Sequence, residues 1–167
     1  MIHASQLEMA RLVVRPFMQA DAPSLVALFA DPEVHRFVDD GQPLAPDVAA
    51  LWIERSAANL ERFGYGTGAV VERAGGGLIG WAGFARPDDG TQEVIYGLRR
   101  TSWRRGFGSE LLAGLVAFAV ERGITPVRAT VDPANGASVH LLRRAGFVLA
   151  EPGYRGDAGA DLYLHGG

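Results

Sequence analysis

The chain has 167 residues, of which 48% are hydrophobic and 21% are charged, and its formal net charge is −3. This composition is typical of a globular protein with one continuous core, and the negative charge argues against general nucleic-acid binding, which needs a basic surface. Cysteine is absent, which excludes thiol catalysis, disulfides and cysteine-ligated zinc. All 16 basic residues are arginine, so a Walker-type phosphate loop and Schiff-base catalysis are also excluded, since both require lysine.

Signals for targeting, membrane insertion and metal binding are weak. The chain does not open with a basic patch followed by an apolar stretch, so no signal peptide is expected. The longest apolar run, 111–120, is interrupted by Gly114 and is shorter than the ~20 residues of a membrane span. The four histidines are scattered without helical spacing. We therefore expect a cytoplasmic protein with no membrane contact and no metal site.

The hydrophobic pattern predicts the elements in chain order. Segment 11–17 predicts a first strand, which Pro16 ends. Asp21 is predicted to cap a helix, Asp31 to start a short second turn, and Pro46 to open a longer helix that Gly64 ends. Further strands are predicted at 69–73, 78–85, 91–98, 127–131, 147–151 and 161–165, and helices at 106–122 and 138–145.

This order of elements indicates the fold class. Strands and helices do not alternate regularly enough for a doubly wound parallel sheet. Gly75-Gly76-Gly77 separates two strand candidates and predicts a hairpin. No repeat or linker interrupts the chain. We expect one α/β domain of the α+β kind over 1–167, with a mixed sheet that contains both hairpins and crossovers.

The loop after the strand at 91–98 carries the strongest chemical signal. It contains Gly106 and Gly108 and opens the helix at 106–122. A helix N-terminus presents unpaired N–H groups and a positive dipole end, which favour phosphate, and glycine lets the backbone approach an anion. Arg104 and Arg105 add positive charge beside successive amides that can form an anion nest. The segment predicts a pyrophosphate site; the alternative is a glycine-containing loop before a core helix, with solvated arginines.

A Rossmann dinucleotide site is the competing interpretation. The pattern Gly106-x-Gly108-x-x-Leu111 lacks the third glycine of that fingerprint, and seven residues separate Leu98 from Gly106 where the Rossmann turn is tight. Asp132 follows the next strand, roughly where a ribose-binding acid would stand. The missing glycine and the long basic loop outweigh it, so a nucleotide-binding oxidoreductase is disfavoured.

Two linked motifs resemble the GNAT superfamily of acyl-CoA N-acyltransferases. Its pyrophosphate loop has Gln or Arg, two residues, Gly, one residue, then Gly or Ala, and 103–108 matches all but the first position. Its other hallmark is Asn-x-x-Ser, a short helix and Gly-Phe, which 135–147 matches. The strand Glu93-Val-Ile-Tyr96-Gly-Leu98 before Trp103, and the opening Arg-Leu-x-x-Arg-Pro-Phe at 11–17, resemble the branch containing ribosomal-protein-alanine acetyltransferases. In that branch tryptophan holds the first loop position.

The resemblance implies a fold and a co-substrate. The fold would be a mixed, mostly antiparallel, bent sheet of about seven strands flanked by about four helices, whose fourth and fifth strands (91–98 and 127–131) splay apart. Acetyl-CoA would lie in the gap, with its pantetheine arm on strand-edge backbone and its pyrophosphate on loop amides. The residues implied in cofactor binding are Gly97, Leu98, Arg99, Arg104, Arg105, Gly106, Phe107, Gly108, Ser109 and Asn135.

Direct acetyl transfer in a ternary complex needs a base for the amine and a donor for the leaving thiolate. Glu93 is the expected general base; the alternative is a strand-edge carboxylate paired with an arginine. Many superfamily members protonate the thiolate with a tyrosine seven residues after the Asn, which is Leu142 here. Ser138 is the expected replacement, since its hydroxyl can donate to sulfur; alternatively it caps a helix.

The sequence says less about the site that binds the acceptor amine. The resemblance places it on the N-terminal helices and the last hairpin, here about 31–63 and 153–165. His35 and Tyr96 are candidates for acceptor contacts, the alternatives being helix packing for His35 and the core for Tyr96. Acidic residues between 31 and 47 favour a cationic amine. The resemblance implies a primary amine of a protein N-terminus, an amino-acid or polyamine metabolite, or an aminoglycoside, and it allows a homodimer. The alternative function is a CoA-binding regulatory module that has lost catalysis.

Overall fold

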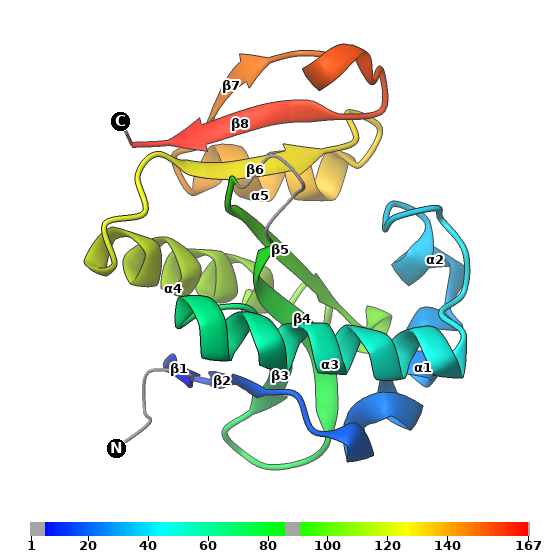
Figure 1. The fold of residues 1–167 in the computed structure, drawn as a ribbon. Coiled ribbons are helices and arrows are strands. Elements are labelled where there is room, and N and C mark those ends of the chain that lie inside the picture. The colour runs from blue at the N-terminus through cyan, green and yellow to red at the C-terminus, as the bar shows by residue number, and fades with distance from the viewer. Residues whose placement is uncertain (1–5, 86–90, 167) are drawn as a thin grey trace.

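The computed structural model describes residues 6–85 and 91–166, which form an eight-stranded sheet with five α-helices packed against it (Figure 1). The sheet order is β1-β2-β3-β4-β5-β6-β8-β7. The strands are β1 (Leu7–Glu8), β2 (Leu12–Pro16), β3 (Thr67–Glu72), β4 (Leu78–Ala85), β5 (Glu93–Leu98), β6 (Val127–Val131), β7 (Val148–Glu151) and β8 (Asp161–His165). The helices are α1 (Ala22–Phe29), α2 (Pro32–His35), α3 (Pro46–Phe63), α4 (Phe107–Glu121) and α5 (Gly136–Arg144), with short 3-10 turns η2 (Gln19–Asp21), η3 (Arg100–Ser102) and η4 (Tyr154–Gly156).

The mixed, mostly antiparallel sheet is confirmed. Every neighbouring pair of strands is antiparallel except β5 and β6, which are parallel. One strand more than expected is present: β1, which pairs with β2 at Leu7↔Val14 and is too short to show a hydrophobic period in the sequence. The short turn expected from Asp31 is confirmed as the single helical turn α2, with Asp31 as its N-cap residue. No helix within the described ranges is long and apolar enough to cross a membrane.

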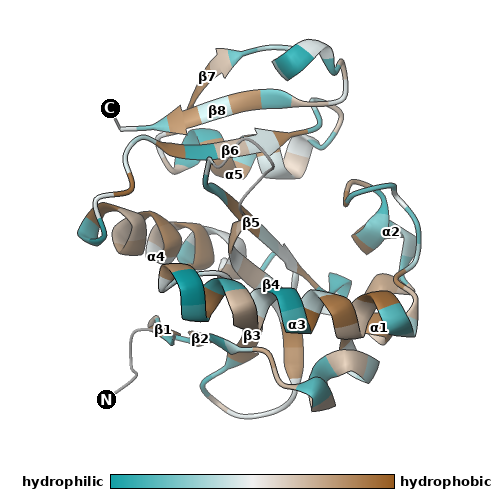
Figure 2. Ribbon diagram, in the orientation of Figure 1, coloured by the Kyte–Doolittle hydropathy of each residue, from teal (hydrophilic) through white to brown (hydrophobic). Residues whose placement is uncertain are grey.

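Two hydrophobic clusters pack against the sheet. In one, α4 and α5 cover the strands, and Leu111, Leu115 and Leu142 are at most 1% exposed. In the other, α1 and α3 pack on Trp81 of β4, whose ring lies 4.7 Å from that of Phe29. Figure 2 shows hydrophobic residues along most of α4, whereas hydrophilic and hydrophobic segments alternate along α3. This difference is expected because an amphipathic surface helix buries only one stripe.

The strands β5 and β6 splay apart, as the resemblance implies. β5 pairs with β4 along its whole length, from Ala85↔Glu93 to Gly80↔Leu98. With β6 it shares one pairing, Glu93↔Arg128. β6 turns instead to β8, and in Figure 1 the strands β6, β8 and β7 form a separate part of the sheet to which β5 leads. Beyond Glu93, the edge of β5 has no strand partner among the described residues.

Gly97 allows β5 to lie against β4. A Cβ at this position would lie 2.1 Å from the ring of Trp81, which is 4% exposed. Any larger residue would therefore displace a buried indole. The alternation expected for β5 is also present: Val94 and Leu98 belong to the cluster under α4, and Ile95 packs with α1 and α3.

One helix start differs from expectation. Asp21 is the N-cap residue of α1, but its side chain makes no capping bond. Its carboxylate instead accepts hydrogen bonds from the Arg15 guanidinium at 2.8 and 2.9 Å and from the Met18 N–H at 2.8 Å. The hydrogen bond from Arg15 is the main reason that the pKa of Asp21 is lowered. A charge-assisted bidentate pair is stronger than a neutral cap, so this carboxylate ties β2 to the start of α1.

Candidate active site

The loop between β5 and α4 has the backbone of an anion-binding nest. Gly106, the N-cap residue of α4, has φ +78°, and Arg104 has φ +61°. The first bond of the helix runs from the Glu110 N–H to the Gly106 carbonyl at 3.1 Å. The N–H groups of Phe107, Gly108 and Ser109 therefore precede the helical ladder. These amides lie at the positive end of the helix dipole and suit a phosphate group.

Arginines hold this loop in place. Arg11 of the segment before β2 donates to a Glu110 carboxylate oxygen and to the Arg105 carbonyl, each at 2.8 Å. Arg105 donates to Glu72 of β3 at 3.2 Å. Arg104, in contrast, has no hydrogen-bond or ion-pair partner in the described part of the chain. Of the neighbouring arginines Arg104 and Arg105, Arg104 is therefore the one whose guanidinium has no partner among the described residues and can meet an anion.

Gly108 has a packing role in addition to offering its N–H. A Cβ at Gly108 would lie 2.9 Å from the Cδ1 atom of Leu141, so glycine lets α4 and α5 approach without a shift of that leucine side chain. A Cβ at Gly106 would meet only an Arg11 nitrogen, at 3.2 Å. The glycine spacing thus serves two needs: Gly106 supplies the left-handed turn, and Gly108 supplies the helix contact.

The edge of β5 offers Leu98 to the gap. The Arg99 N–H donates to the Ile79 carbonyl of β4 at 2.8 Å. Adjacent residues of a strand direct their backbone groups to opposite sides, so Gly97 and Arg99 face β4 and Leu98 faces the gap. The Leu98 carbonyl accepts the Trp103 indole N–H at 2.7 Å. The Leu98 N–H remains a donor at this edge.

Glu93 lies where β5 and β6 part. Its Oε1 accepts a hydrogen bond from the Thr130 hydroxyl at 3.2 Å, and Arg128 is its partner in the strand pairing. Burial raises the pKa of Glu93 above its ordinary value, against the opposing effects of Thr130 and Arg128. A raised pKa makes this carboxylate a stronger base near neutral pH, which suits a general base.

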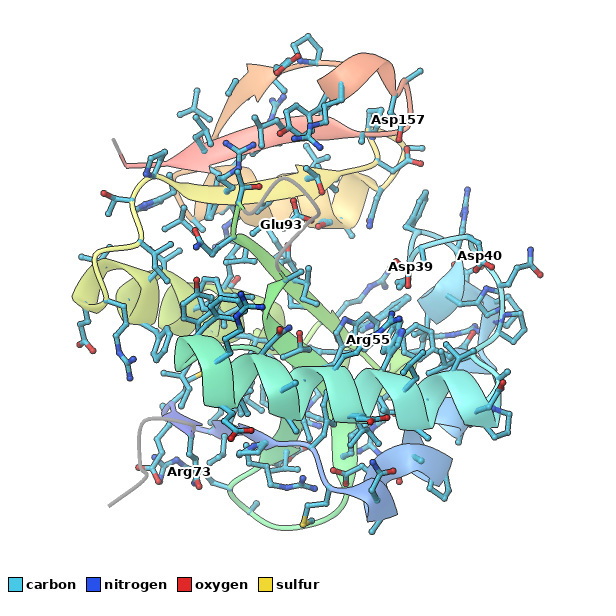
Figure 3. All side chains as sticks on the ribbon, in the orientation of Figure 1. Asp39, Asp40, Arg55, Arg73, Glu93 and Asp157 are labelled. Carbon is cyan, nitrogen blue, oxygen red and sulfur yellow. The ribbon has the colours of Figure 1, made fainter. Side chains whose placement is uncertain are left out.

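A pocket of about 220 Å³ opens beside Glu93. It is bounded by the ends of β5 and β6 and by the hairpin between β7 and β8, and it is lined by Thr91, Glu93, Thr130, Tyr154, Arg155, Asp157 and Ala160. The Tyr154 hydroxyl accepts a hydrogen bond from Arg128 at 2.6 Å. Figure 3 shows Asp157 on this hairpin, and Asp39 and Asp40 on the loop after α2 at the same side of the molecule. Acidic groups around an opening attract a cation.

Asn135 and Ser138 begin α5 and have different roles from one another. The Asn135 side chain is the helix cap, since its Oδ1 accepts the Ser138 N–H at 3.3 Å. The alternative interpretation of Ser138 as the cap is therefore wrong. The Ser138 hydroxyl lies 2.9 Å from the Tyr96 hydroxyl of β5, on the other side of the gap. The side-chain nitrogen of Asn135 makes no hydrogen bond with any described residue, so it is available to a ligand.

His35 and Tyr96 do not line the pocket beside Glu93. The His35 Nδ1 is 2.9 Å from the Gly41 carbonyl and holds the loop after α2. Tyr96 packs on the cluster under α4. The sequence does not identify Tyr154, Arg128 or Asp157 as site residues. It predicts only the strand that contains Arg128 and the hairpin that contains Tyr154 and Asp157. Within 6–85 and 91–166, no group of three or more His, Asp or Glu side chains could hold a metal ion.

Comparisons with known proteins identify chains that are similar to this one in sequence and in fold. The family model of the acetyltransferase (GNAT) domain matches residues 11–148. The uncharacterized N-acetyltransferase YoaA of Bacillus subtilis is 30% identical over 145 residues, which cover 84% of this chain and 81% of that protein.

Two solved structures extend the comparison. An acetyltransferase from Agrobacterium tumefaciens superposes with a TM-score of 0.84 at 25% identity, covering 97% of this chain and 94% of that one. The ribosomal L7/L12 alpha-N-protein acetyltransferase RimL, in complex with coenzyme A, superposes with a TM-score of 0.78 at 18% identity, covering 96% and 97%. At that identity the likeness to RimL concerns the fold. The match over most of the chain shows that this protein belongs to the GNAT acetyltransferase family.

Proposed function

We propose that this chain transfers an acetyl group from acetyl-CoA to a primary amine by direct attack in a ternary complex. The gap beside β5 carries the proposal. β5 begins at Glu93, which lines the pocket. At its other end β5 leads into the loop before α4, whose backbone amides suit phosphate. The Arg104 guanidinium and the Asn135 side-chain nitrogen, which have no hydrogen-bond partner within 6–85 and 91–166, also fit a ligand that carries both phosphates and amide groups.

The residues at the gap supply each requirement of the reaction. The Glu93 carboxylate takes the proton of the amine, directly or through water, and a positioned base contributes about 10²- to 10⁴-fold to rate. The Leu98 N–H polarises the thioester carbonyl. The amine nitrogen bonds to the carbonyl carbon, the carbon–sulfur bond breaks, and its electron pair goes to sulfur. The Ser138 hydroxyl donates a hydrogen bond to that sulfur.

The pocket beside Glu93 is the proposed acceptor site. Its volume of about 220 Å³ admits an amine with a short segment attached, and Glu93 and Asp157 attract the ammonium form. RimL acts on the N-terminus of a ribosomal protein by its name, which supports a protein N-terminus as one acceptor class. An amino-acid or polyamine metabolite and an aminoglycoside are the other classes. We place the reaction in the cytoplasm, with 1–167 as one catalytic domain.

The first experiment measures ligand-induced stabilisation. A ligand present at 100 times its Kd adds about 2.7 kcal/mol to the free energy of unfolding, so acetyl-CoA and CoA are expected to raise Tm and NAD is not. Stabilisation by NAD alone would overturn the proposal. A panel of amines with detection of the released thiol then identifies the acceptor. Because the chain contains no lysine, no side-chain primary amine of the enzyme itself competes for the acetyl group.

A regulatory CoA-binding module is the second candidate. The observation that favours it is Leu142, which is 1% exposed and removes the tyrosine that many superfamily members use as acid. This candidate predicts a rise in Tm with CoA but no thiol release with any amine. Thiol release that depends on both the amine and Glu93 would exclude it.

A further inference from the structure

Two hydroxyl groups meet across the gap at the start of α5. Tyr96 extends from β5 and Ser138 from the first turn of α5, and their oxygens are 2.9 Å apart. This is a contact between a strand and a helix that are 42 residues apart in the sequence. Tyr96 is on the same strand as Leu98, whose N–H faces the gap, so the pair lies beside the edge where the thioester is expected.

The contact places a phenol where the helix itself lacks one. Leu142 follows Ser138 by one helical turn and is buried in the core. Side chains of a helix point back toward its N-terminus, so a residue at 142 covers the turn that contains Ser138. A hydroxyl from 142 is impossible here, and Tyr96 brings its own hydroxyl to that turn from the opposite side of the gap.

We propose that Tyr96 is a positioning residue that donates its O–H to the Ser138 oxygen and thereby directs the Ser138 O–H toward the sulfur that leaves in acetyl transfer. This inference rests on the function proposed above. Each hydroxyl has one proton, so when Tyr96 donates to Ser138, the Ser138 proton is free for a second partner. Linked hydrogen bonds of this kind strengthen one another.

The surroundings of Tyr96 keep its proton in place. Burial raises the pKa of Tyr96, with the Ser138 hydrogen bond as the opposing effect. The phenol is thus a neutral donor throughout the working pH range. No proton transfer from Tyr96 is needed: the sulfur keeps the electron pair of the broken bond, the Ser138 O–H stabilises its charge, and the thiolate takes a proton from water after release.

The test is a double-variant cycle with Tyr96→Phe, Ser138→Ala and the double variant. Tyr96→Phe keeps the ring, so the core is expected to stay folded. Removing a hydrogen-bond donor to a developing anion lowers kcat by about 10²-fold or more. We expect a loss of this size for Ser138→Ala and a smaller loss of kcat for Tyr96→Phe. The KM for acetyl-CoA should change little in either variant. Because Tyr96 acts through Ser138, the double variant should lose no more than Ser138→Ala alone.

Tyr163→Phe is the matched control. Tyr163 is a buried tyrosine of β8 whose hydroxyl accepts from Arg143 at 3.5 Å outside the gap, so this variant should retain kcat. Losses that multiply in the double variant would show that Tyr96 acts independently and would overturn the proposal. A Tyr96→Phe variant that kept the kcat of the unmodified enzyme would also overturn the proposal.

A binding measurement separates this inference from the proposed function. Dissociation constants for CoA and desulfo-CoA are compared at alkaline pH, where the thiol ionises. The unmodified protein should favour CoA, and both Tyr96→Phe and Ser138→Ala should lose that preference. If both variants preferred CoA over desulfo-CoA as strongly as the unmodified protein does, the proposed action of Tyr96 through Ser138 would be wrong. Absence of acetyl transfer to every amine, with the preference intact, would instead contradict only the proposed function.

Discussion

Arg100 binds Asp31 through two hydrogen bonds. Arg100 belongs to the turn η3 after β5, and Asp31 is the N-cap residue of α2. The guanidinium donates through Nε to Oδ2 at 2.9 Å and through Nη2 to Oδ1, while Oδ1 also accepts the Glu33 N–H at 3.0 Å. One carboxylate therefore links the loop between β5 and α4 to the start of α2.

Arg100→Ala is expected to raise KM for the acceptor amine and to leave the Kd for CoA nearly unchanged. The pair is largely exposed, so its contribution to folding is small, and its effect lies in where α2 sits. Steady-state kinetics and CoA calorimetry check this. Arg99→Ala is the control, because among the described residues the Arg99 side chain bonds only to Ser102, within its own loop. A similar rise in acceptor KM for both variants would contradict a specific role for Arg100.

Glu93→Gln is expected to lower kcat by about 100-fold or more. The amide keeps the size of the side chain and can still accept from Thr130, but it cannot take a proton. Since burial raises the pKa of Glu93, kcat of the unmodified enzyme should fall as pH drops through that raised pKa. The variant should lack this acidic limb. A pH profile of kcat that is unchanged in the variant would remove Glu93 from the mechanism.

The same substitution is expected to stabilise the fold. The folded pKa of Glu93 is raised above its unfolded value, so ionised Glu93 costs stability at pH values above both. Glu93→Gln should therefore raise the free energy of unfolding at pH 7. The gain should disappear as pH falls through the folded pKa to the unfolded value of about 4.3. Urea unfolding at several pH values measures this, with the exposed Glu54→Gln as control for the change in net charge.

Gly97→Ala is expected to destabilise the protein by about 3 kcal/mol, because its Cβ would overlap the buried Trp81 ring. The control is Gly136→Ala at the start of α5. A Cβ there meets nothing within 4 Å, and alanine lowers the conformational entropy of the unfolded chain, which stabilises the fold by about 0.4–1 kcal/mol. Chemical denaturation should thus move in opposite directions for the two variants. Equal effects would show that the contact with Trp81 is not limiting.

The fold was predictable where a local pattern determines it. Pro46 and Gly64 mark the ends of α3 through backbone chemistry alone, and the bounds of β4, β6 and β8 follow from β-branched and apolar runs. Asp21 was misread because the pattern of a cap does not show a competing partner six residues earlier. In the folded protein the Arg15 guanidinium donates to that carboxylate.

The site was predictable in outline and not in its contacts. Glu93, Ser138 and the loop glycines stand in motifs of fixed spacing. The contacts of the site come from distant segments: Tyr96 of β5 meets Ser138 of α5, and Arg128 of β6 meets Tyr154 of the hairpin between β7 and β8. No spacing in one sequence encodes such a meeting. The second role of Gly108 was hidden for the same reason, since its contact is made by another helix.

The indole of Trp103 gives the molecule an optical signal of its own. This side chain is 40% exposed and holds the Leu98 carbonyl at the mouth of the gap, whereas Trp52 and Trp81 pack with α1 and α3. A ligand that occupies the loop changes the polarity around one of three emitters. Intrinsic fluorescence should therefore follow acetyl-CoA binding without a label, and Trp103→Phe should abolish the change in emission.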